Sequence, residues 1–421
     1  MEFVTAIVAA SFIVFALVSR RLERTPITGP MLFVALGIIL GPEVLDIARS
    51  FDEIDFVDVV LTVTLTIVLF TDASAVNSSN WKQDAALPGR LLGIGLPLTI
   101  AAGWVTALLM LGDLEFWEAA VLGTMLAPTD AALGKAVISN PRVPQRIRQA
   151  LNVESGLNDG VALPVFVVFL EAAAASEDSL SIADFLSELT AEVGIAVAVG
   201  VLIGWAGAKL LRWASATQMA QHYWLEIAVV ALALMAYALA DPLGGSGFIA
   251  AWVAGVVFGR FCVDSEVDTH EFAEAVGDGL TMISFLLFGV FVGPVLESLT
   301  WEAFLYGVIS LVVIRVAAVA VSMIGSGLRP ASVLYLGWFG PRGLATVILT
   351  IAVIDATELD GAGLITDAAL VTVVLSVVAH GATAWWGSNA YADRIEAMPD
   401  PHEMLEHESA PVVRVPRRAT P

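Results

Sequence analysis

Apolar residues in this chain gather in long runs that are separated by short polar stretches. Runs such as Leu91–Leu111 and Phe304–Ile324 are about as long as a helix must be to cross a hydrocarbon layer of roughly 30 Å. A buried helix of a soluble protein can imitate one such run, but not about a dozen in series. The pattern predicts an all-α polytopic membrane protein of about 13 transmembrane helices, at approximately 3–19, 28–47, 55–72, 90–111, 117–138, 149–171, 190–211, 224–240, 246–263, 277–296, 302–323, 331–354 and 364–387.

The two ends of the chain differ in character. The first apolar run has neither a basic segment ahead of it nor a small-residue cleavage site, so we interpret it as a helix that stays and not as a signal peptide. Residues 1–394 then form the transmembrane domain. The polar residues 395–421 are too few and too polar to fold by themselves, and we expect a disordered cytoplasmic tail.

Composition excludes several classes of protein. Of the 421 residues, 58% are hydrophobic and 15% are charged, whereas a soluble domain carries about a quarter charged residues. Cys262 is the single cysteine, which excludes a disulfide within the chain and a multi-cysteine metal site, and the five histidines do not cluster in the apolar body. We expect no cofactor and no nucleic-acid partner.

Charged loop residues alternate between the two sides of the predicted bundle. Acidic residues dominate one set of loops, in which Arg49 is the one basic exception. The other set carries the basic residues, among them Arg20, Arg21, Arg24, Lys82, Arg90, Lys135, Arg142, Arg146, Arg148, Lys209, Arg212, Arg260, Arg329 and Arg394. Because basic loops stay in the cytoplasm, we expect an outer N-terminus, a cytoplasmic C-terminus and a location in the cell membrane. The net charge of −22 then lies mainly outside, where it either concentrates cations or reflects adaptation to salty or acidic surroundings.

A few ionisable residues lie deep inside the apolar runs. They are Asp130, Glu154, Asp159, Arg315 and Arg342. A charge at mid-membrane costs several kcal/mol unless it faces protein or water and finds a partner. Internal ion pairs between helices are one explanation. However, three carboxylates and two guanidiniums leave one carboxylate without a permanent partner, and a proton and a small cation would compete for that group.

The sixth predicted span places oxygen ligands on one side of a helix. Glu154 and Asn158 are four residues apart and share a face, and Ser155 and Asp159 share another face rotated by about 100°. A hydroxyl and a carboxylate are hard ligands that suit Na⁺. We therefore expect Asp159 and Ser155 to bind the cation, with Thr129 of the preceding span as a further ligand.

Two spans are interrupted near mid-membrane. Pro128 breaks the fifth span next to Thr129 and Asp130, and Gly337–Gly343 breaks the twelfth. Matching interruptions in two halves of a membrane protein indicate inverted repeats that share a midplane site. We expect Arg342 to face Asp130 and to offset the half-helix dipoles, and Arg315 to pair with Glu154, which leaves Asp159 free. For Asp72 there are two interpretations, a place in the cytoplasmic funnel or a charge at a helix end, and we prefer the second.

These residues resemble the monovalent cation–proton antiporter superfamily, in the NhaP-like branch that includes the eukaryotic Na⁺/H⁺ exchangers. The resemblance rests on Pro128-Thr129-Asp130, Glu154-Ser155 with Asn158-Asp159, Arg315 and Gly340–Gly343, and it extends over all the predicted spans.

The resemblance implies an NhaA-like fold of inverted repeats with two crossed, broken helices in a mobile core, which moves like an elevator against a dimerisation bundle. The core would comprise approximately 90–171 and 302–387, and the bundle of a homodimer approximately 1–72 and 224–296. Asp159, Ser155, Thr129 and Asp130 would form the cation and proton site; Asn158, Glu154, Arg315, Arg342 and Pro128 would support it. The Asn158-Asp159 pair implies electroneutral exchange.

The predicted function is antiport of Na⁺ or Li⁺ against H⁺, with a role in pH homeostasis. K⁺/H⁺ exchange on the same fold is the serious alternative, since oxygen ligands alone do not choose between the two ions. An intramembrane aspartyl protease is a remote one: Asn158 replaces a glycine of its Gly-x-Gly-Asp element, and its Tyr-Asp motif is missing. Neither a repeated channel filter nor a nucleotide-binding loop is visible.

Overall fold

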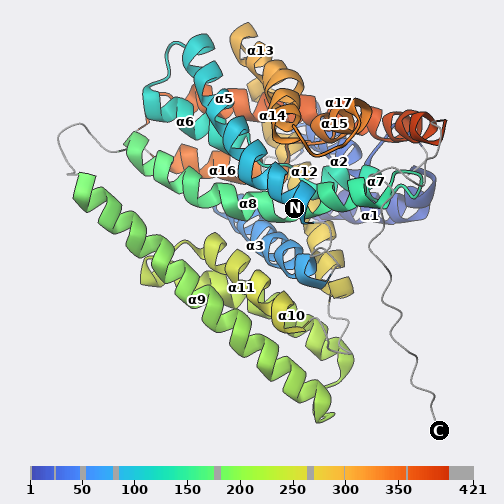
Figure 1. Ribbon diagram of the computed structural model, residues 1–421, viewed down its shortest axis with the longest axis vertical. Coiled ribbons are helices and arrows are strands. Elements are labelled where there is room, and N and C mark those ends of the chain that lie inside the picture. The colour runs from blue at the N-terminus through green and yellow to red at the C-terminus, as the bar shows by residue number, and fades with distance from the viewer. Residues whose placement is uncertain are drawn as a thin grey trace.

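The computed structural model describes residues 2–22, 25–47, 54–78, 85–174, 182–262, 270–297, 299–356 and 359–397, and all regular structure in these ranges is helical (Figure 1). Within them, nine helices are long and apolar enough to cross a membrane, and three apolar helices are shorter. Several charges placed in loops or in the tail by the sequence lie outside the described residues: Arg24, Arg49, Lys82 and the tail beyond Ala397.

Every predicted span has a helical counterpart, so the predicted fold class is confirmed. The unbroken helices are α1 (Glu2–Leu22), α2 (Gly29–Leu40), α3 (Ile54–Ser78), α8 (Gln145–Ala174), α9 (Ile182–Ala216), α10 (His222–Ala240), α11 (Gly247–Cys262), α12 (His270–Glu297) and α17 (Ala362–Glu396). The fourth span comprises α4 (Ala86–Arg90), a π-helical turn and α5 (Leu96–Met110), and the eleventh comprises α13 (Trp301–Ile309), a π-helical turn and α14 (Arg315–Ser322).

The fifth and twelfth spans are broken as predicted. The fifth consists of α6 (Phe116–Met125) and α7 (Ala131–Ile138), and the twelfth of α15 (Pro330–Trp338) and α16 (Leu344–Asp355). The fourth and eleventh spans, which precede them in the two halves, both contain a π-helical turn. Matching irregularities seven spans apart are what inverted repeats produce.

Predicted helix boundaries are less accurate than the spans themselves. The second span was expected to reach residue 47, but α2 ends at Leu40. Gly41 is extended, with ψ of 176°, because it precedes Pro42 and a residue before proline disfavours the helical region. In contrast, α9 and α17 continue past the predicted limits, so the first residues of the predicted tail, up to Glu396, are helical.

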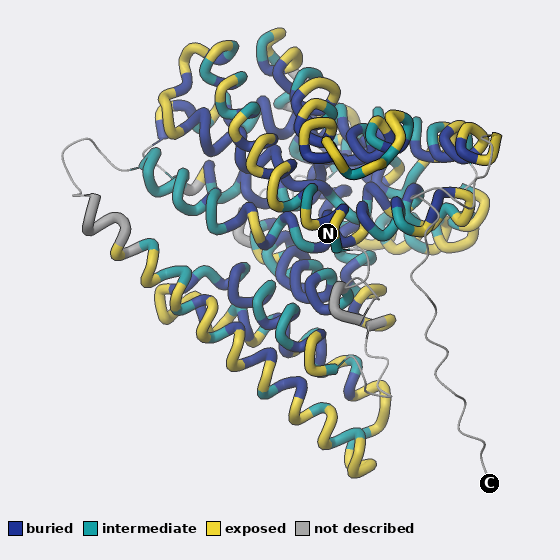
Figure 2. The backbone as a smooth tube through the Cα atoms, in the orientation of Figure 1, coloured by how far each residue is buried: buried dark blue, intermediate teal, exposed yellow. Residues whose placement is uncertain are grey.

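The outer surface of the bundle is apolar. Leu17 and Leu109 are 80% and 79% exposed, and tryptophans such as Trp213 and Trp386 are exposed as well. Figure 2 shows buried residues where helices meet and exposed residues along the outer helices. A soluble monomer rarely exposes so much apolar surface, and these faces fit a lipid environment.

The helices pack in two groups. In one group, α11 packs on α3 and α9, α10 joins α9 and α11, and α12 packs on α2; these helices form the scaffold group. In the other, which we call the core group, α5 packs on α6, α6 on α8, and α17 on α13 and α16. Figure 1 shows α9, α10 and α11 as a layer beside the rest. The packing places α9 with the scaffold group, and the mobility of the core and the dimerisation role of the other helices stay predictions.

Glycines let α11 approach α3 closely. A methyl group added at Gly255 or Gly259 would overlap the carbonyl oxygens of Phe70 and Ser74. Helices in lipid have no hydrophobic driving force for association, so the close van der Waals packing that small residues allow stabilises such contacts.

We expect Gly259→Ala to destabilise the protein by about 1–3 kcal/mol, because the added methyl group forces α11 away from α3. Gly279→Ala is the control, since no atom lies within 4 Å of a methyl group there. Thermal unfolding in detergent, followed by tryptophan fluorescence, measures both. Equal melting temperatures for the two variants would contradict the packing argument.

Candidate functional site

The breaks of the fifth and twelfth spans lie against each other. The Asp130 N–H donates to the Pro341 carbonyl at 2.8 Å, and the Thr346 hydroxyl donates to the Met125 carbonyl at 2.8 Å. The unwound segments therefore satisfy each other's backbone groups, which an interrupted helix in lipid requires.

Asp130 caps two half-helices at once. One carboxylate oxygen accepts from Leu133 N–H of α7 at 2.8 Å, and the other accepts from Leu344 N–H of α16 at 2.7 Å. The negative carboxylate thus meets the positive ends of both helix dipoles. Gly343 makes this possible, because a methyl group there would overlap the Asp130 carboxylate. The structure thus shows Asp130 as a cap of both half-helices, and its place in the ion site stays a prediction.

Arg342 binds the carbonyl end of one half-helix, α6. Its guanidinium is buried and donates from Nη1 to the carbonyls of Ala127 and Pro128, which follow the C-terminus of α6. The expected contact between Arg342 and Asp130 is therefore wrong. Asp130 instead caps the N-termini of α7 and α16, and Arg342 binds carbonyls after the C-terminus of α6, so each charge faces helix ends of opposite polarity without an ion pair between the two residues.

The expected pair of Glu154 and Arg315 is present. Arg315 Nη1 and Nη2 donate to the two Glu154 oxygens at 2.5 and 2.8 Å, and the arginine and glutamate side chains are 1% and 2% exposed. Gly340 packs on the Arg315 guanidinium, where a side chain would collide with it. Two parallel hydrogen bonds of this kind fix the relative position of α8 and α14 in a low-dielectric interior.

Thr129, Ser155 and Asn158 form a buried polar cluster. The hydroxyls of Thr129 and Ser155 lie 3.0 Å apart, and Asn158 Nδ2 donates to Thr129 Oγ1 at 2.7 Å. Sequence reasoning grouped Asn158 with Glu154 on a separate face. In the structure, Ser155 and Asn158 of α8 both contact Thr129 at the break of the fifth span.

Two oxygen atoms beside this cluster lack partners. Asp159 Oδ1 and Asn158 Oδ1 are buried and have no hydrogen-bond donor among the described residues. The carboxylates of Asp130 and Asp72 act on Asp159 electrostatically. Buried acceptors without donors are unfavourable, and a proton or a bound cation relieves that penalty.

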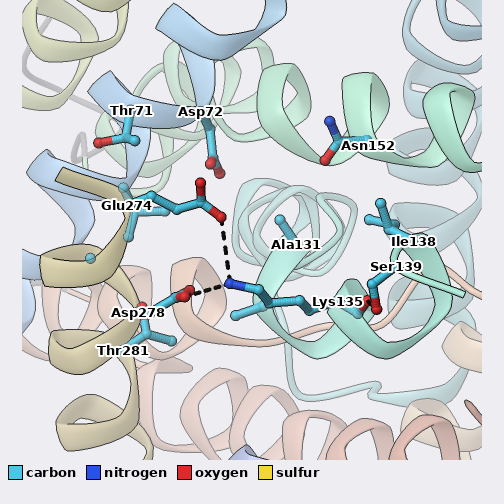
Figure 3. A pocket seen from close by; sticks show the side chains of 13 residues that line it. Thr71, Asp72, Ala131, Lys135, Ile138, Ser139, Asn152, Glu274, Asp278 and Thr281 are labelled. Atoms are coloured by element: carbon cyan, nitrogen blue, oxygen red, sulfur yellow. Dashed lines mark hydrogen bonds and ion pairs between the residues drawn. The ribbon is translucent and has the colours of Figure 1, made fainter. Parts of the chain in front are cut away.

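A cavity of about 280 Å³ approaches this region between α3, α7, α8 and α12 (Figure 3). Asp72, Lys135, Asn152, Glu274 and Asp278 are its polar lining residues together with three hydroxyl side chains. Asp72 lies within α3, which continues to Ser78, so its interpretation as a helix-end charge is wrong. On the other side, Asp72 packs against α8 at Gly156, where an added methyl group would lie 3.4 Å from the Asp72 Cβ.

Sequence reasoning missed two carboxylates. Asp72 was set aside because the third span was drawn to end there. Glu118 was counted as an outer loop charge, but it is 3% exposed and accepts from the backbone N–H groups of Glu115 and Gly361 at 2.9 and 2.7 Å. The count of buried charges was therefore incomplete, and it does not by itself single out Asp159.

A family model described as "Sodium/hydrogen exchanger, transmembrane" matches residues 7–386. The K(+)/H(+) antiporter NhaP2 of Shewanella sp. (strain ANA-3) is 26% identical over 386 residues, covering 90% of this chain and 64% of that protein. The K(+)/H(+) antiporter NhaP of Alkalimonas amylolytica is 25% identical over 349 residues, covering 80% and 58%. The chain therefore spans less than two thirds of the length of these relatives.

Among solved structures, the sodium proton antiporter MjNhaP1 from Methanocaldococcus jannaschii at pH 8 superposes with a TM-score of 0.75 at 22% identity. The match covers 93% of this chain and 100% of that chain. At this level of identity, the likeness establishes a shared fold.

We expect Asp130→Ala to destabilise the protein by about 2 kcal/mol, because two caps are lost, and Asp130→Asn by about half as much, because one acceptor remains. Thr300→Ala removes the single cap of α13, in which Thr300 accepts from Ala303 N–H at 3.2 Å, and is the control. Thermal unfolding in detergent ranks the variants. The double-cap assignment fails if Asp130→Ala is no worse than Thr300→Ala.

We expect Glu154→Gln and Arg315→Gln each to cost about 3–5 kcal/mol, since either change leaves an unpaired buried charge. The exchanged pair, Glu154→Arg with Arg315→Glu, should unfold at a higher temperature than either charge-reversal variant alone. Arg142→Gln, which disrupts exposed ion pairs with Asp393 and Glu396, should be nearly neutral. Unchanged melting temperatures in the single variants would show that the pair is not structural.

Proposed function

The chain belongs to the sodium/hydrogen exchanger family, and on that premise we propose that it exchanges one Na⁺ for one H⁺ at Asp159. One observation carries the proposal: Asp159 Oδ1 and the neighbouring Asn158 Oδ1 are buried without a donor among the described residues. A carboxylate in that state binds either a proton or a small cation. Because a single group serves both ions, binding one displaces the other, which is the requirement for antiport.

The proposed ligands of the cation are side-chain oxygen atoms, two of which are positioned by hydrogen bonds. Asp159 supplies the carboxylate, and Ser155 and Thr129 supply hydroxyl oxygens 3.0 Å apart. Asn158 holds Thr129 in place through its amide. Asp130 has both oxygens occupied by backbone donors, so we assign it to the support of the site and not to direct binding.

Asp72 is a proposed second carboxylate on the route to the site. It lines the cavity and stands against Gly156, which is three residues before Asp159 on α8. A cation that reaches the cavity can thus pass from one carboxylate towards the other. Glu154 and Arg315 neutralise each other and take no part in ion exchange in this scheme.

Alternating access by an elevator movement fits the way that α8 meets the scaffold. Gly156 faces Asp72 of α3, and Gly160 lies so close to the Trp252 ring of α11 that a methyl group would overlap it. Glycines on both sides of Asp159 give α8 a smooth surface along the scaffold helices. We propose that the core carries Asp159 past this contact when its charge is neutralised by H⁺ or by the cation.

K⁺/H⁺ exchange is the second candidate. The relatives from Shewanella and Alkalimonas are named K(+)/H(+) antiporters, whereas the similar solved structure is a sodium proton antiporter. Cavity size and rigidity, more than the type of ligand, separate the two ions. We further propose a homodimer in the cell membrane with an outer N-terminus, supported by the family and by the alternation of basic loops.

We expect Asp159→Asn to abolish exchange, because a neutral amide neither takes up the proton nor balances the charge of the cation. NaCl, LiCl or KCl is added in turn to liposomes that contain the purified protein and an internal pH dye. The wild-type KM for the preferred cation should rise as the pH falls, because protons compete with the cation for Asp159. Glu171→Gln is the matched carboxylate-to-amide control on α8, more than about three turns from the site. Wild-type rates in Asp159→Asn would refute the shared site.

A further inference from the structure

The cavity beside Asp72 is lined by a positively charged side chain, that of Lys135. We infer that Lys135 is a tethered counter-ion of this vestibule and sets the apparent affinity for the transported cation. The inference rests on the proposed function, since it concerns the route by which the cation reaches Asp159. By the vestibule we mean the cavity bounded by Asp72, Lys135, Glu274 and Asp278.

Lys135 is held by two carboxylates of one helix. Its ammonium contacts Asp278 and lies 3.5 Å from Glu274. Glu274 and Asp278 are four residues apart on α12 and share a face. Figure 3 shows both pointing at the ammonium from the scaffold side, while Lys135 extends from α7.

A third carboxylate completes the vestibule. Asp72 lines the same cavity as Glu274, and its electrostatic neighbours include Glu274, Asp278, Asp130 and Lys135. With all groups ionised, three carboxylates face one ammonium, so the vestibule keeps a net charge of about −2. That charge attracts any cation that enters, and Lys135 limits how strongly it does so.

The exposure of these groups argues against a purely structural role. The side chains of Lys135, Glu274 and Asp278 are 53%, 60% and 42% exposed. Ion pairs with so much water access contribute little stability. Their field still acts on mobile ions over about 8–10 Å, and it weakens as salt screens it. Lys135 therefore has more effect on cations than on the fold.

The same contacts suggest a rival role for Lys135. Because α7 packs on α8 and α17 and α12 packs on α2 and α3, the pair joins the core to the scaffold and would act as a latch on this conformation. The two roles separate in kinetics. A counter-ion changes KM in a salt-dependent way, whereas a latch changes kcat.

The experiment compares Lys135→Gln with Lys135→Arg, which keeps the charge. Arg142→Gln is the matched control, because it removes a positive charge that lies close to Lys135 in sequence but outside the vestibule. Hydrogen bonds to Asp393 and Glu396 raise the pKa of the Arg142 guanidinium. Exchange in liposomes is measured against NaCl and KCl concentration, at low ionic strength and again with impermeant N-methylglucamine salt. The cation concentration for half-maximal thermal stabilisation in detergent is a second readout that needs no transport.

We expect Lys135→Gln to lower KM roughly two- to fivefold at low ionic strength, with the difference fading in high salt. Lys135→Arg and Arg142→Gln should keep the wild-type KM, and Asp278→Asn should raise it. An unchanged KM in Lys135→Gln, or a change in kcat alone that salt does not affect, overturns the inference. If the wild-type protein exchanges no cation, the proposed function fails, and the thermal midpoints still decide the role of Lys135.

Discussion

The double cap at Asp130 is the interaction on which the rest of the site depends. Two membrane helices are broken against each other, and each break frees backbone N–H and C=O groups that lipid cannot satisfy. The Asp130 carboxylate accepts from α7 and α16, and the Arg342 guanidinium donates to the carbonyls after α6. These charges stabilise the unwound segments by binding their free backbone groups. With them, Thr129 is presented to Ser155 and Asn158 at a fixed place.

Among the buried acids, the carboxylate of Asp159 differs from the others in its hydrogen-bond partners. Glu154 is neutralised by Arg315, whereas Glu118 and Asp130 each accept from two backbone N–H groups. Within the described part of the chain, Asp159 is the acid that combines burial with a carboxylate oxygen lacking a donor. The same low dielectric that makes a missing partner unfavourable makes a bound ion effective.

The placement of α8 between two packing groups supports the proposed movement of the core. On one side, α8 is tied to the core by the Glu154–Arg315 pair and by the contacts of Ser155 and Asn158 with Thr129. On the other side, it meets α3 and α11 through Gly156 and Gly160, which have no side chains to interlock with the scaffold. Polar contacts towards the core and contacts through glycine towards the scaffold are consistent with the proposal that the core moves as one body.

Features that depend on local chemistry could be predicted from the sequence. Hydrophobic length located the spans, Pro128 and Gly340-Pro341 located the breaks, and the scarcity of partners for buried charge predicted the pairing of Glu154 with Arg315. Contacts between groups far apart in the chain became visible in the folded protein: Arg342 with the carbonyls of the fifth span, Glu118 with Gly361, and Asp72 and Lys135 with α12 in one cavity. Helix length and helix breaks follow from neighbouring residues, whereas the partner of a charge depends on how helices far apart in the chain cross.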